Sequence, residues 1–267
     1  MKLKSSFLTF LLIPLNFTIS PAQSDMETRD DFKKIFDVYK VQGSFALYDR
    51  KNEKYIVCNE NQFKKAFIPA STFKICNSLI ALETNAVKDE NVVFKWDGIA
   101  RSNPEWNKDQ SMREAFANST VWYYQELARR IGGRRMSYWL NKIKYGNADT
   151  SGGIDRFWLT GGLRITPEQQ IGFLRRLSKE ELPLSRQTMD IVKKIMIVKD
   201  TVGYTIRAKT GWSDQDGQSV GWYVGYVQTD DNAFFFSTCI QCSGNNPDFG
   251  RARTEITFAI LRALKLY

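Results

Sequence analysis

The sequence contains no histidine among its 267 residues. This absence excludes a Ser-His-Asp triad and a Cys-His pair, because imidazole is the base that activates the nucleophile in both. It also excludes every zinc site that depends on imidazole ligands. A nucleophilic serine in this chain must therefore find another base, and lysine is the natural candidate.

Cysteine is scarce, with four residues at Cys58, Cys76, Cys239 and Cys242. Four cysteines in an exported chain can form disulfides, but the sequence does not say which of them pair. Cys239 and Cys242 have CxxC spacing, yet there is neither the second CxxC that a zinc cage needs nor a thioredoxin-like context. We therefore expect no metal site.

Long apolar runs are also missing. The apolar stretch from Phe7 to Ile19 follows Lys2 and Lys4 and is shorter than the roughly 20 residues that span a membrane. Small residues up to Ala22 complete the pattern of a secretory signal. We predict that residues 1–22 are a signal peptide and that residues 23–267 form one domain, exported to the periplasm or secreted, with no membrane anchor.

The charge is moderately positive, with 38 Lys and Arg against 29 Asp and Glu, a net +9. Removing residues 1–22 takes away two lysines and no acid, which leaves 36 − 29 = +7. Such a charge is compatible with nucleic acid, anionic membranes or anionic small molecules. The basic pairs are separated along helical stretches, as solvated helix faces are, so we expect no nucleic-acid partner: 129–130, 134–135, 175–176 and 193–194.

Strand patterns occupy both ends of the chain and helical patterns its middle. The strands include a predicted hairpin, 43–48 with 54–57, and three later runs, 204–209, 220–228 and 233–240. Apolar residues recur with helical period in seven further segments: 71–82, 111–117, 121–131, 136–143, 167–177, 185–197 and 251–264. The order predicts an α+β fold, in which a mostly antiparallel sheet from both termini is flanked by helices and carries an inserted helical subdomain at about 95–200.

Ser71 and Lys74 lie three residues apart in the stretch PASTFK. On a helix this spacing puts both side chains on one face and leans the lysine back toward the serine hydroxyl. A lysine acts as a base only when neutral, which requires apolar neighbours such as Phe73 and Ile75. The alternative is that Ser71 is only a helix cap, because Ser-x-x-Lys alone arises by chance in many chains.

Lys209, Thr210 and Gly211 end an alternating segment and precede Trp212. From the end of a strand, Lys209 would offer a fixed cation to a substrate carboxylate, and Gly211 would let a substrate approach the backbone. Ser-x-x-Lys together with Lys-Thr-Gly is far more specific than either motif, because penicillin-recognising enzymes carry both.

Five motifs together resemble those of the class D serine β-lactamases in order and spacing: PASTFK (69–74), STV (119–121), YGN (145–147), FWL (157–159) and KTGW (209–212). The resemblance covers residues 43–264. It implies a penicillin-recognising serine hydrolase fold and hydrolysis of the β-lactam amide of penicillin-type antibiotics through a serine acyl-enzyme, hence antibiotic resistance. The implied partner is a small-molecule β-lactam, and the implied protein is a monomer or homodimer.

The resemblance also implies roles for single residues. Ser71 is the implied nucleophile and Lys74 the implied general base, after carbon dioxide has converted its amine to N6-carboxylysine. No other cofactor is implied. Trp158 would donate a hydrogen bond to this carbamate, and Val121 and Leu159 would cover it with apolar side chains. On spacing alone, the preferred interpretation of Trp158 is a plain core aromatic.

Further roles concern the substrate. Ser119 would pass a proton to the departing lactam nitrogen, or would simply start a helix. The N–H groups of Ser71 and Trp212 would form the oxyanion hole. The substrate-binding residues would be Lys209, Thr210, Gly211 and Arg253, with Arg251 a competing choice for the carboxylate. Tyr145, Gly146 and Asn147 would shape the site without transferring protons. Substrate preference depends on loops near Trp106, Trp212 and Ser213, and the sequence does not decide it.

Three other functions remain open. A penicillin sensor shares the serine, lysine and Lys-Thr-Gly motifs and stays acylated, but usually follows several membrane spans. A peptidoglycan transpeptidase or carboxypeptidase usually has Ser-x-Asn where this chain has Ser119-Thr120-Val121. A basic, non-enzymatic binding module explains the charge but leaves five ordered motifs unexplained.

Overall fold

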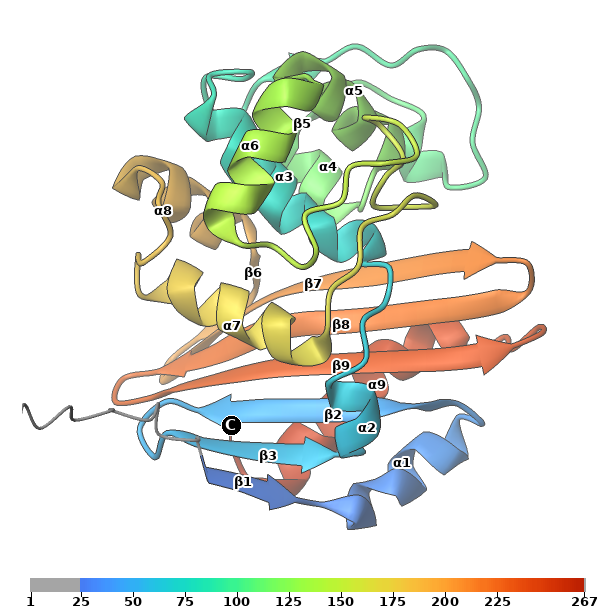
Figure 1. Ribbon diagram of the computed structural model, residues 1–267, viewed down its shortest axis with the longest axis vertical. Helices are drawn as coiled ribbons and strands as arrows, with labels where there is room; N and C mark the ends of the chain where they lie inside the picture. The colour runs from blue at the N-terminus through green and yellow to red at the C-terminus, as the bar shows by residue number, and fades with distance from the viewer. Residues whose placement is uncertain (1–24, 267) are drawn as a thin grey trace, which may run out of the picture.

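The computed structural model describes residues 25–266, so the predicted signal peptide lies outside the described residues. Its centre is a seven-stranded sheet in the order β1-β3-β2-β9-β8-β7-β6 (Figure 1). Neighbouring strands are antiparallel except for the parallel pair of β1 and β3. The strands are β1 (Asp25–Thr28), β2 (Gln42–Asp49), β3 (Lys54–Cys58), β6 (Ile197–Thr201), β7 (Tyr204–Gln215), β8 (Gln218–Thr229) and β9 (Ala233–Ser243).

This arrangement confirms the α+β prediction, since strands from the two ends of the chain meet where β2 pairs with β9. One prediction about the sheet is wrong. Residues 209–211 do not end a strand, because β7 continues for six residues beyond the predicted end at Lys209. The sequence pattern also gave no sign of β1 or β6, which are short and at the two edges of the sheet.

The hairpin of β7 and β8 is long and regular. Its register runs from Tyr204 opposite Thr229 to Gln215 opposite Gln218 without a bulge. Asp216 and Gly217 form the two-residue turn, and both have positive φ, at 52° and 71°. Asp-Gly is a favoured pair for such a turn, because the positive φ angles match the twist of the strands.

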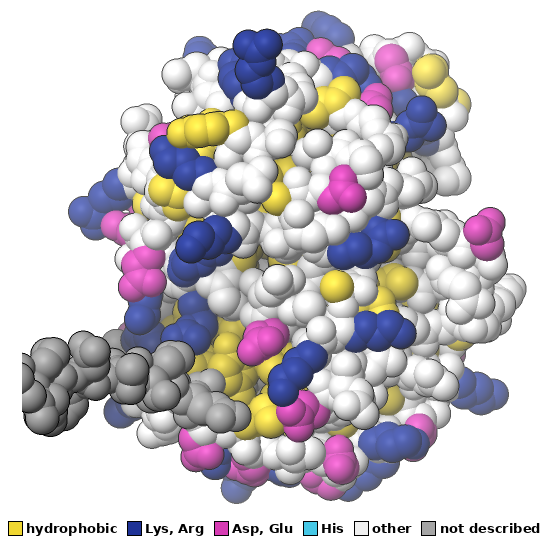
Figure 2. All heavy atoms as spheres, viewed as in Figure 1, with side chains coloured by type: hydrophobic (Ala, Val, Ile, Leu, Met, Phe, Trp, Pro, Cys, Tyr) yellow, Lys and Arg dark blue, Asp and Glu magenta, His cyan; other side chains and the backbone are white. Residues whose placement is uncertain are grey.

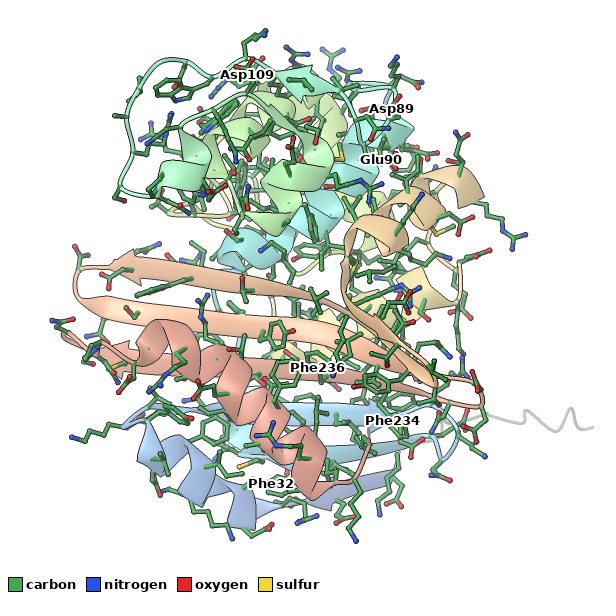
Figure 3. The ribbon with its side chains drawn as sticks, turned by 180° about the vertical axis from the view of Figure 1, so that it is seen from behind. Phe32, Asp89, Glu90, Asp109, Phe234 and Phe236 are labelled. Carbon is green, nitrogen blue, oxygen red and sulfur yellow. The ribbon has the colours of Figure 1, made fainter. Side chains whose placement is uncertain are left out.

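Helices cover both faces of the sheet and extend beyond one edge. Figure 1 shows α7 across one face and the group α3 to α6 beyond the β7 edge, and Figure 3 shows α9 crossing the other face. The helices are α1 (Lys33–Val38), α2 (Glu60–Phe63), α3 (Lys74–Glu83), α4 (Met112–Ala117), α5 (Val121–Ile131), α6 (Gly133–Ile143), α7 (Pro167–Ser178), α8 (Arg186–Ile195) and α9 (Phe249–Ala263). Short elements are the 3-10 turns η1 (Asp30–Phe32), η2 (Ala70–Phe73) and η3 (Pro104–Trp106) and the strand pair β4 (Val93–Phe94) and β5 (Gln110–Ser111).

Two helix predictions need correction. The α-helix predicted from Ser71 begins at Lys74, because the preceding residues form the 3-10 turn η2. The helix predicted to run to residue 197 stops at Ile195, since Ile197 pairs with Arg207 in the sheet. Pairing with a strand overrides the local helical pattern here. The predicted start of α7 is confirmed, with Thr166 and Gln169 forming a capping box.

Each face of the sheet has its own apolar core. The larger core fills the space between the sheet and α3 to α8, and includes Phe73, Trp158 and Trp222. The second core lies under α1 and α9 and includes Phe32, Phe236 and Ile256; Figure 3 labels the two phenylalanines. The strand alternation therefore sends successive side chains into two different cores.

The surface carries mixed charges. Figure 2 shows Lys and Arg side chains dispersed over the visible face, with Asp and Glu among them. The expectation that nucleic acid is not a partner stays a prediction. Within residues 25–266 no helix combines the length and the apolarity that crossing a membrane requires.

Candidate active site

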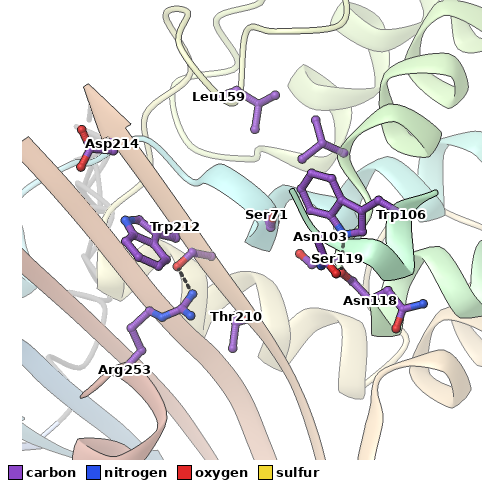
Figure 4. Close-up of a pocket in the computed structure, with 12 residues that line it drawn as sticks. Ser71, Asn103, Trp106, Asn118, Ser119, Leu159, Thr210, Trp212, Asp214 and Arg253 are labelled. Carbon is purple, nitrogen blue, oxygen red and sulfur yellow. Dashed lines mark hydrogen bonds between the residues drawn. The ribbon is translucent and has the colours of Figure 1, made fainter. Parts of the chain in front are cut away.

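A cleft of about 470 Å³ opens between β7 and the helical part of the molecule (Figure 4). The strand β6 pairs with β7 only as far as Arg207, so the later part of β7 has a free edge on this side. Most residues with a predicted site role line the cleft together: Ser71, Ser119, Val121, Leu159, Thr210, Gly211, Trp212 and Arg253.

The nucleophile candidate and its base lie at the floor of the cleft. Nζ of Lys74 is 2.8 Å from Oγ of Ser71, in a hydrogen bond. Lys74 is fully buried, whereas Ser71 is 8% exposed and reaches the cleft. Burial lowers the pKa of Lys74 well below its ordinary value, and the charge of Lys209 lowers it further. The amine of Lys74 is therefore set up to be neutral and to take a proton.

Trp158 lies beside this pair. Its ring packs on Phe73 at 5.2 Å between centroids, and its carbonyl accepts the N–H of Ala70. The indole N–H is buried and has no hydrogen-bond partner among residues 25–266. A buried donor without an acceptor costs roughly 1–3 kcal/mol, and indole can only donate. The segment that carries Ser71 and Lys74 therefore packs against a tryptophan whose buried N–H could donate to an anionic oxygen.

The Tyr145-Gly146-Asn147 motif fixes the loop that carries Trp158. The side chain of Asn147 donates to the carbonyl of Gly162 at 3.0 Å and accepts the N–H of Arg164 at 2.9 Å. Gly146 has φ +53°, and a Cβ there would lie 2.1 Å from the carbonyl oxygen of Arg164. The hydrogen bonds of Asn147 and the close approach at Gly146 thus hold the backbone of this loop in place. A role in shaping the site stays a prediction.

Leu159, the next residue of this loop, is held in place by hydrogen bonds from strand β7. Its carbonyl oxygen accepts hydrogen bonds from Oγ of Ser213 and Nε2 of Gln215, each at 3.0 Å. Val121 starts α5 and lines the cleft as Leu159 does. The two apolar residues predicted to cover Lys74 are thus both at the cleft, on the helical side.

Ser119 faces the sheet across the cleft. Nζ of Lys209 donates to Oγ of Ser119 at 3.0 Å, a contact between residues 90 positions apart. The alternative role of Ser119 as a helix start is wrong, since the N-cap of α5 is Thr120. Ser119 instead has φ +56°, in the left-handed region that residues with a side chain seldom adopt.

Lys209 is the second buried lysine of the site, at 5% exposure. Burial, with the charge of Arg253 adding to it, lowers the pKa of Lys209 to about 7. Nζ also donates to the carbonyl and hydroxyl oxygens of Thr210, at 3.2 and 3.3 Å. An amine with this pKa changes its charge near neutrality, so it can act both as a cation and as a proton donor.

Arg253 reaches the cleft from α9. Nη1 donates to the carbonyl of Gly211 at 2.8 Å, and the guanidinium lies 5.5 Å from the ring of Trp212 (Figure 4). Arg251, the competing choice, does not line the cleft and pairs with Asp248 and Glu255. The geometry therefore favours Arg253 for an anionic substrate group.

Gly211, on the sheet side of the cleft, lies close to the turn that carries Ser71. A Cβ at this position would lie 3.0 Å from the carbonyl oxygen of Pro69 and 3.1 Å from Cγ2 of Thr72. The backbone around Ser71 and that around Trp212 are therefore neighbours across the cleft, as two oxyanion-hole donors must be. Any side chain at position 211 would push these two segments apart.

Several cleft residues have no counterpart in the predictions. Asn103, Asn118 and Asp214 line it, and Trp106 forms part of it rather than only lying near it. Nε1 of Trp106 donates to the carbonyl of Asn118 at 3.0 Å, which ties η3 to the end of α4. These residues come from irregular loops without a motif, so no sequence signal was available for them.

The cysteines take no part in the cleft. All four have free thiols, and burial raises the pKa of Cys76 and Cys239 above the ordinary value. Among residues 25–266 no three His, Cys, Asp or Glu side chains gather as a metal site would require.

Comparison with known proteins agrees with this geometry. Residues 41–262 match the penicillin-binding protein transpeptidase domain family. The chain is 46% identical over 202 residues to the β-lactamase OXA-48 of Klebsiella pneumoniae, which covers 76% of each protein. A class D β-lactamase structure from Nostoc superposes with a TM-score of 0.85 at 44% identity, over 89% of this chain and 99% of that one.

A penicillin receptor shares the fold as closely. The C-terminal domain of the Bacillus licheniformis BlaR receptor superposes with a TM-score of 0.87 at 33% identity, over 93% of this chain and all of that one. Backbone similarity alone therefore does not separate a hydrolase from a receptor that is acylated.

Proposed function

This chain belongs to the class D β-lactamases, and from that premise we propose that it hydrolyses the amide bond of penicillin-type β-lactams through an acyl-enzyme on Ser71. One observation carries the proposal: the buried amine of Lys74, with its lowered pKa, lies 2.8 Å from the hydroxyl of Ser71. In a chain without histidine, this pair supplies both the nucleophile and its base.

Acylation begins when Oγ of Ser71 attacks the lactam carbonyl carbon while the side chain of Lys74 removes the hydroxyl proton. The carbonyl oxygen becomes an oxyanion, which the N–H groups of Ser71 and Trp212 stabilise. Losing one such donor typically costs about 10²–10³ in rate. The close approach of the backbone at Gly211 supports this placement of the two donors.

The C–N bond then breaks and the lactam nitrogen needs a proton. Ser119 is placed to deliver it, because its hydroxyl is hydrogen-bonded to Nζ of Lys209. The pKa of Lys209, about 7, suits a group that replaces the proton of Ser119 near neutral pH. Hydrolysis of the Ser71 ester by water releases the opened product and restores the enzyme.

We propose that Lys74 works as N6-carboxylysine. Carbon dioxide adds to a neutral amine, which the lowered pKa of Lys74 provides. The indole N–H of Trp158, buried without a partner, fits as the donor that would hold the carboxylate. When present, this group supplies a general base with an anionic oxygen. Val121 and Leu159 would shield it from bulk water.

The carboxylate of the substrate would bind at the sheet wall. Arg253, Thr210 and Lys209 offer a guanidinium, a hydroxyl and an amine, and the first two line the cleft. Charge-assisted hydrogen bonds of this kind are roughly twice as strong as neutral ones. A β-lactam held there would present its carbonyl carbon to Ser71.

The test is turnover of a chromogenic cephalosporin by the purified chain, with and without added bicarbonate. We expect many turnovers per molecule, faster with bicarbonate, and none for Ser71→Ala. A single stoichiometric burst followed by arrest would instead indicate a receptor or a transpeptidase. If the intact protein neither turns over nor becomes acylated, all penicillin-recognising functions are wrong.

We also propose that residues 1–22 direct export and are then removed. Lys2 and Lys4, the apolar stretch after them and Ala22 support the proposal. Expression of the full chain in a bacterium should yield a secreted or periplasmic protein whose mass corresponds to residues 23–267. A full-length protein retained in the cytoplasm would contradict this.

A further inference from the structure

The turn that presents Ser71 has an unusual backbone. Ala70, directly before Ser71, has φ +49° and is fully buried. Residues with a side chain rarely adopt this left-handed conformation, and it persists only where the surroundings hold it in place. The position of Ser71 therefore depends on whatever holds residues 69–72.

Three hydrogen bonds hold this turn directly. The N–H of Ala70 donates to the carbonyl of Trp158 at 3.0 Å. The carbonyl of Pro69 accepts both the N–H of Thr72, at 3.2 Å, and the hydroxyl of Thr72, at 2.7 Å. The hydroxyl contact is the shorter, so Thr72 closes the turn around Ser71 through its side chain as well as its backbone.

A fourth bond comes from far along the chain. Nε2 of Gln170, on α7, donates to Oγ1 of Thr72 at 2.8 Å. The carbonyl of Pro69 can only accept, so the Thr72 hydroxyl must point its hydrogen there. With its hydrogen donated there, Oγ1 of Thr72 can only accept from other partners, and the amide of Gln170 is such a donor. Gln170 thus supports the direction in which the hydroxyl donates.

Packing alone does not explain why a glutamine occupies position 170. It is fully buried, and its Oε1 has no hydrogen-bond partner among residues 25–266. An apolar side chain would fill the same space without a buried orphan acceptor, and such orphans are rare enough to need an explanation. The explanation that the contacts support is the bond to Thr72.

The helix that carries Gln170, α7, is held in place by its packing on the sheet. α7 lies across the sheet and packs on β2, β8 and β9 (Figure 1). Thr72 in turn touches the opposite wall, since Cγ2 lies 3.1 Å from where a Cβ of Gly211 would be. A shift of Thr72 would therefore move Ser71 and also its spacing from the N–H of Trp212.

We infer that Gln170 is a positioning residue for the nucleophile, acting through the hydroxyl of Thr72 on the turn that holds Ser71. The inference rests on the proposed acylation of Ser71. Gln170 does not touch the substrate in this account. Its contribution is to keep the carbonyl of Pro69 and the backbone of Ser71 aligned with the oxyanion-hole donors.

The test measures the second-order rate constant of acylation with a fluorescent penicillin in Gln170→Met, Thr72→Val and the double variant. Because displacing a reacting group by about 1 Å can cost up to about 10²-fold, we expect each single variant to be slower by about tenfold. We expect the double variant to be no slower than the worse single one. Both changes break the same chain of hydrogen bonds, from Gln170 through Thr72 to the carbonyl of Pro69. Thr72→Ser keeps the hydroxyl and should retain a rate close to wild type.

The matched control is Thr188→Val, which removes the buried hydroxyl that accepts a hydrogen bond from Oγ of Ser185 at the start of α8 and does not line the cleft. It should lower the melting temperature without slowing acylation. The inference is overturned if Gln170→Met and Thr72→Val are acylated at the wild-type rate, or if their effects add in the double variant. If Gln170→Met does not fold, Gln170→Leu takes its place, because the Thr72 variants alone do not test Gln170. Absence of acylation in the wild-type protein would instead refute the proposed function.

Discussion

The two walls of the cleft are built from different kinds of backbone. The sheet wall is the β7–β8 hairpin, whose register is continuous over its whole length. The helical wall contains two residues with a left-handed backbone, Ala70 and Ser119, and a buried indole N–H on Trp158 that no described residue accepts. Strain and unsatisfied groups gather where bonds are to be made, and the regular wall offers fixed charges for binding.

Each wall also contributes one buried lysine, and the two differ in their partners. Lys209 keeps hydrogen bonds to Ser119 and Thr210, and its pKa is lowered to about 7. Lys74 contacts Ser71 and the ring of Tyr124, and its pKa is lowered well below the ordinary value. In the proposed mechanism one residue type thus serves two tasks, because the surroundings differ: a base at Lys74, and a cation and proton donor at Lys209.

The largest effect is expected for Lys74, the proposed general base on the helical side of the cleft. Lys74→Ala should lower steady-state turnover by about 10³-fold or more, since positioned general bases contribute about 10²–10⁴-fold. Deacylation should suffer more than binding, so intact-protein mass spectrometry should find the acyl-enzyme of Lys74→Ala accumulating. Turnover at the wild-type rate would show that Lys74 is not the base.

The next largest effect is expected for the indole N–H of Trp158. Trp158→Phe keeps an aromatic ring in the core but removes the N–H, so we expect Lys74 to retain the carbamate less well. A hydrogen bond to a charged group is worth about 1.5–3 kcal/mol, which corresponds to a loss of about 10- to 150-fold without added bicarbonate.

Added bicarbonate should restore much of this loss, because it raises the occupancy of the carbamate. Trp96→Phe is the matched control, as the indole N–H of Trp96 already has an acceptor, the carbonyl of Ile99. If Trp158→Phe were slow at every bicarbonate concentration, the role of Trp158 would be packing alone.

A smaller effect is expected on the sheet wall. Arg253→Ala should lower kcat/KM for an anionic β-lactam by about tenfold, near the low end for a charge-assisted hydrogen bond. The loss should appear in KM rather than in kcat, because the guanidinium binds and does not react. Arg251→Ala should leave both constants unchanged, and the opposite result would reverse the assignment of the two arginines.

The smallest effect is on stability. The pKa of Lys209 is lowered to about 7 in the folded protein and returns to about 10.4 on unfolding. Between these values the unfolded chain binds more protons, so the free energy of unfolding should rise with pH, by up to about 1.4 kcal/mol per unit for this group. Below about pH 7 both states are protonated and the dependence on Lys209 disappears.

Urea denaturation at pH 6, 7, 8 and 9 measures this dependence. Lys209→Met removes the titrating group while keeping an apolar stem, so its stability should rise less steeply with pH than that of the wild type. Parallel curves for the two proteins would mean that Lys209 keeps an ordinary pKa in the folded state.

Much of the fold was accessible from local patterns. The hairpin of β2 and β3, the strands β8 and β9 and the start of α7 follow from alternation and from capping residues, whose effects act over a few positions. The errors arose where distant pairing decides. β7 extends past Lys209 because β8 continues beside it, and α8 ends early because Ile197 pairs with Arg207.

The sequence by itself determined the chemistry that is available. The absence of histidine left lysine as the base, and helical geometry placed Lys74 one turn from Ser71 because that relation spans three residues. Motif order then indicated the family. None of this required knowing what lies across the cleft.

Only the tertiary structure decided the surroundings of these groups. It buried Lys74, brought Lys209 to Ser119 across 90 residues and set Gln170 behind Thr72. It also left the indole N–H of Trp158 without a partner among residues 25–266. The physical reason is that solvation and long-range contact depend on how whole layers pack. A pKa or a hydrogen-bond direction is a property of that packing, and it cannot be read from the identity of the residue alone.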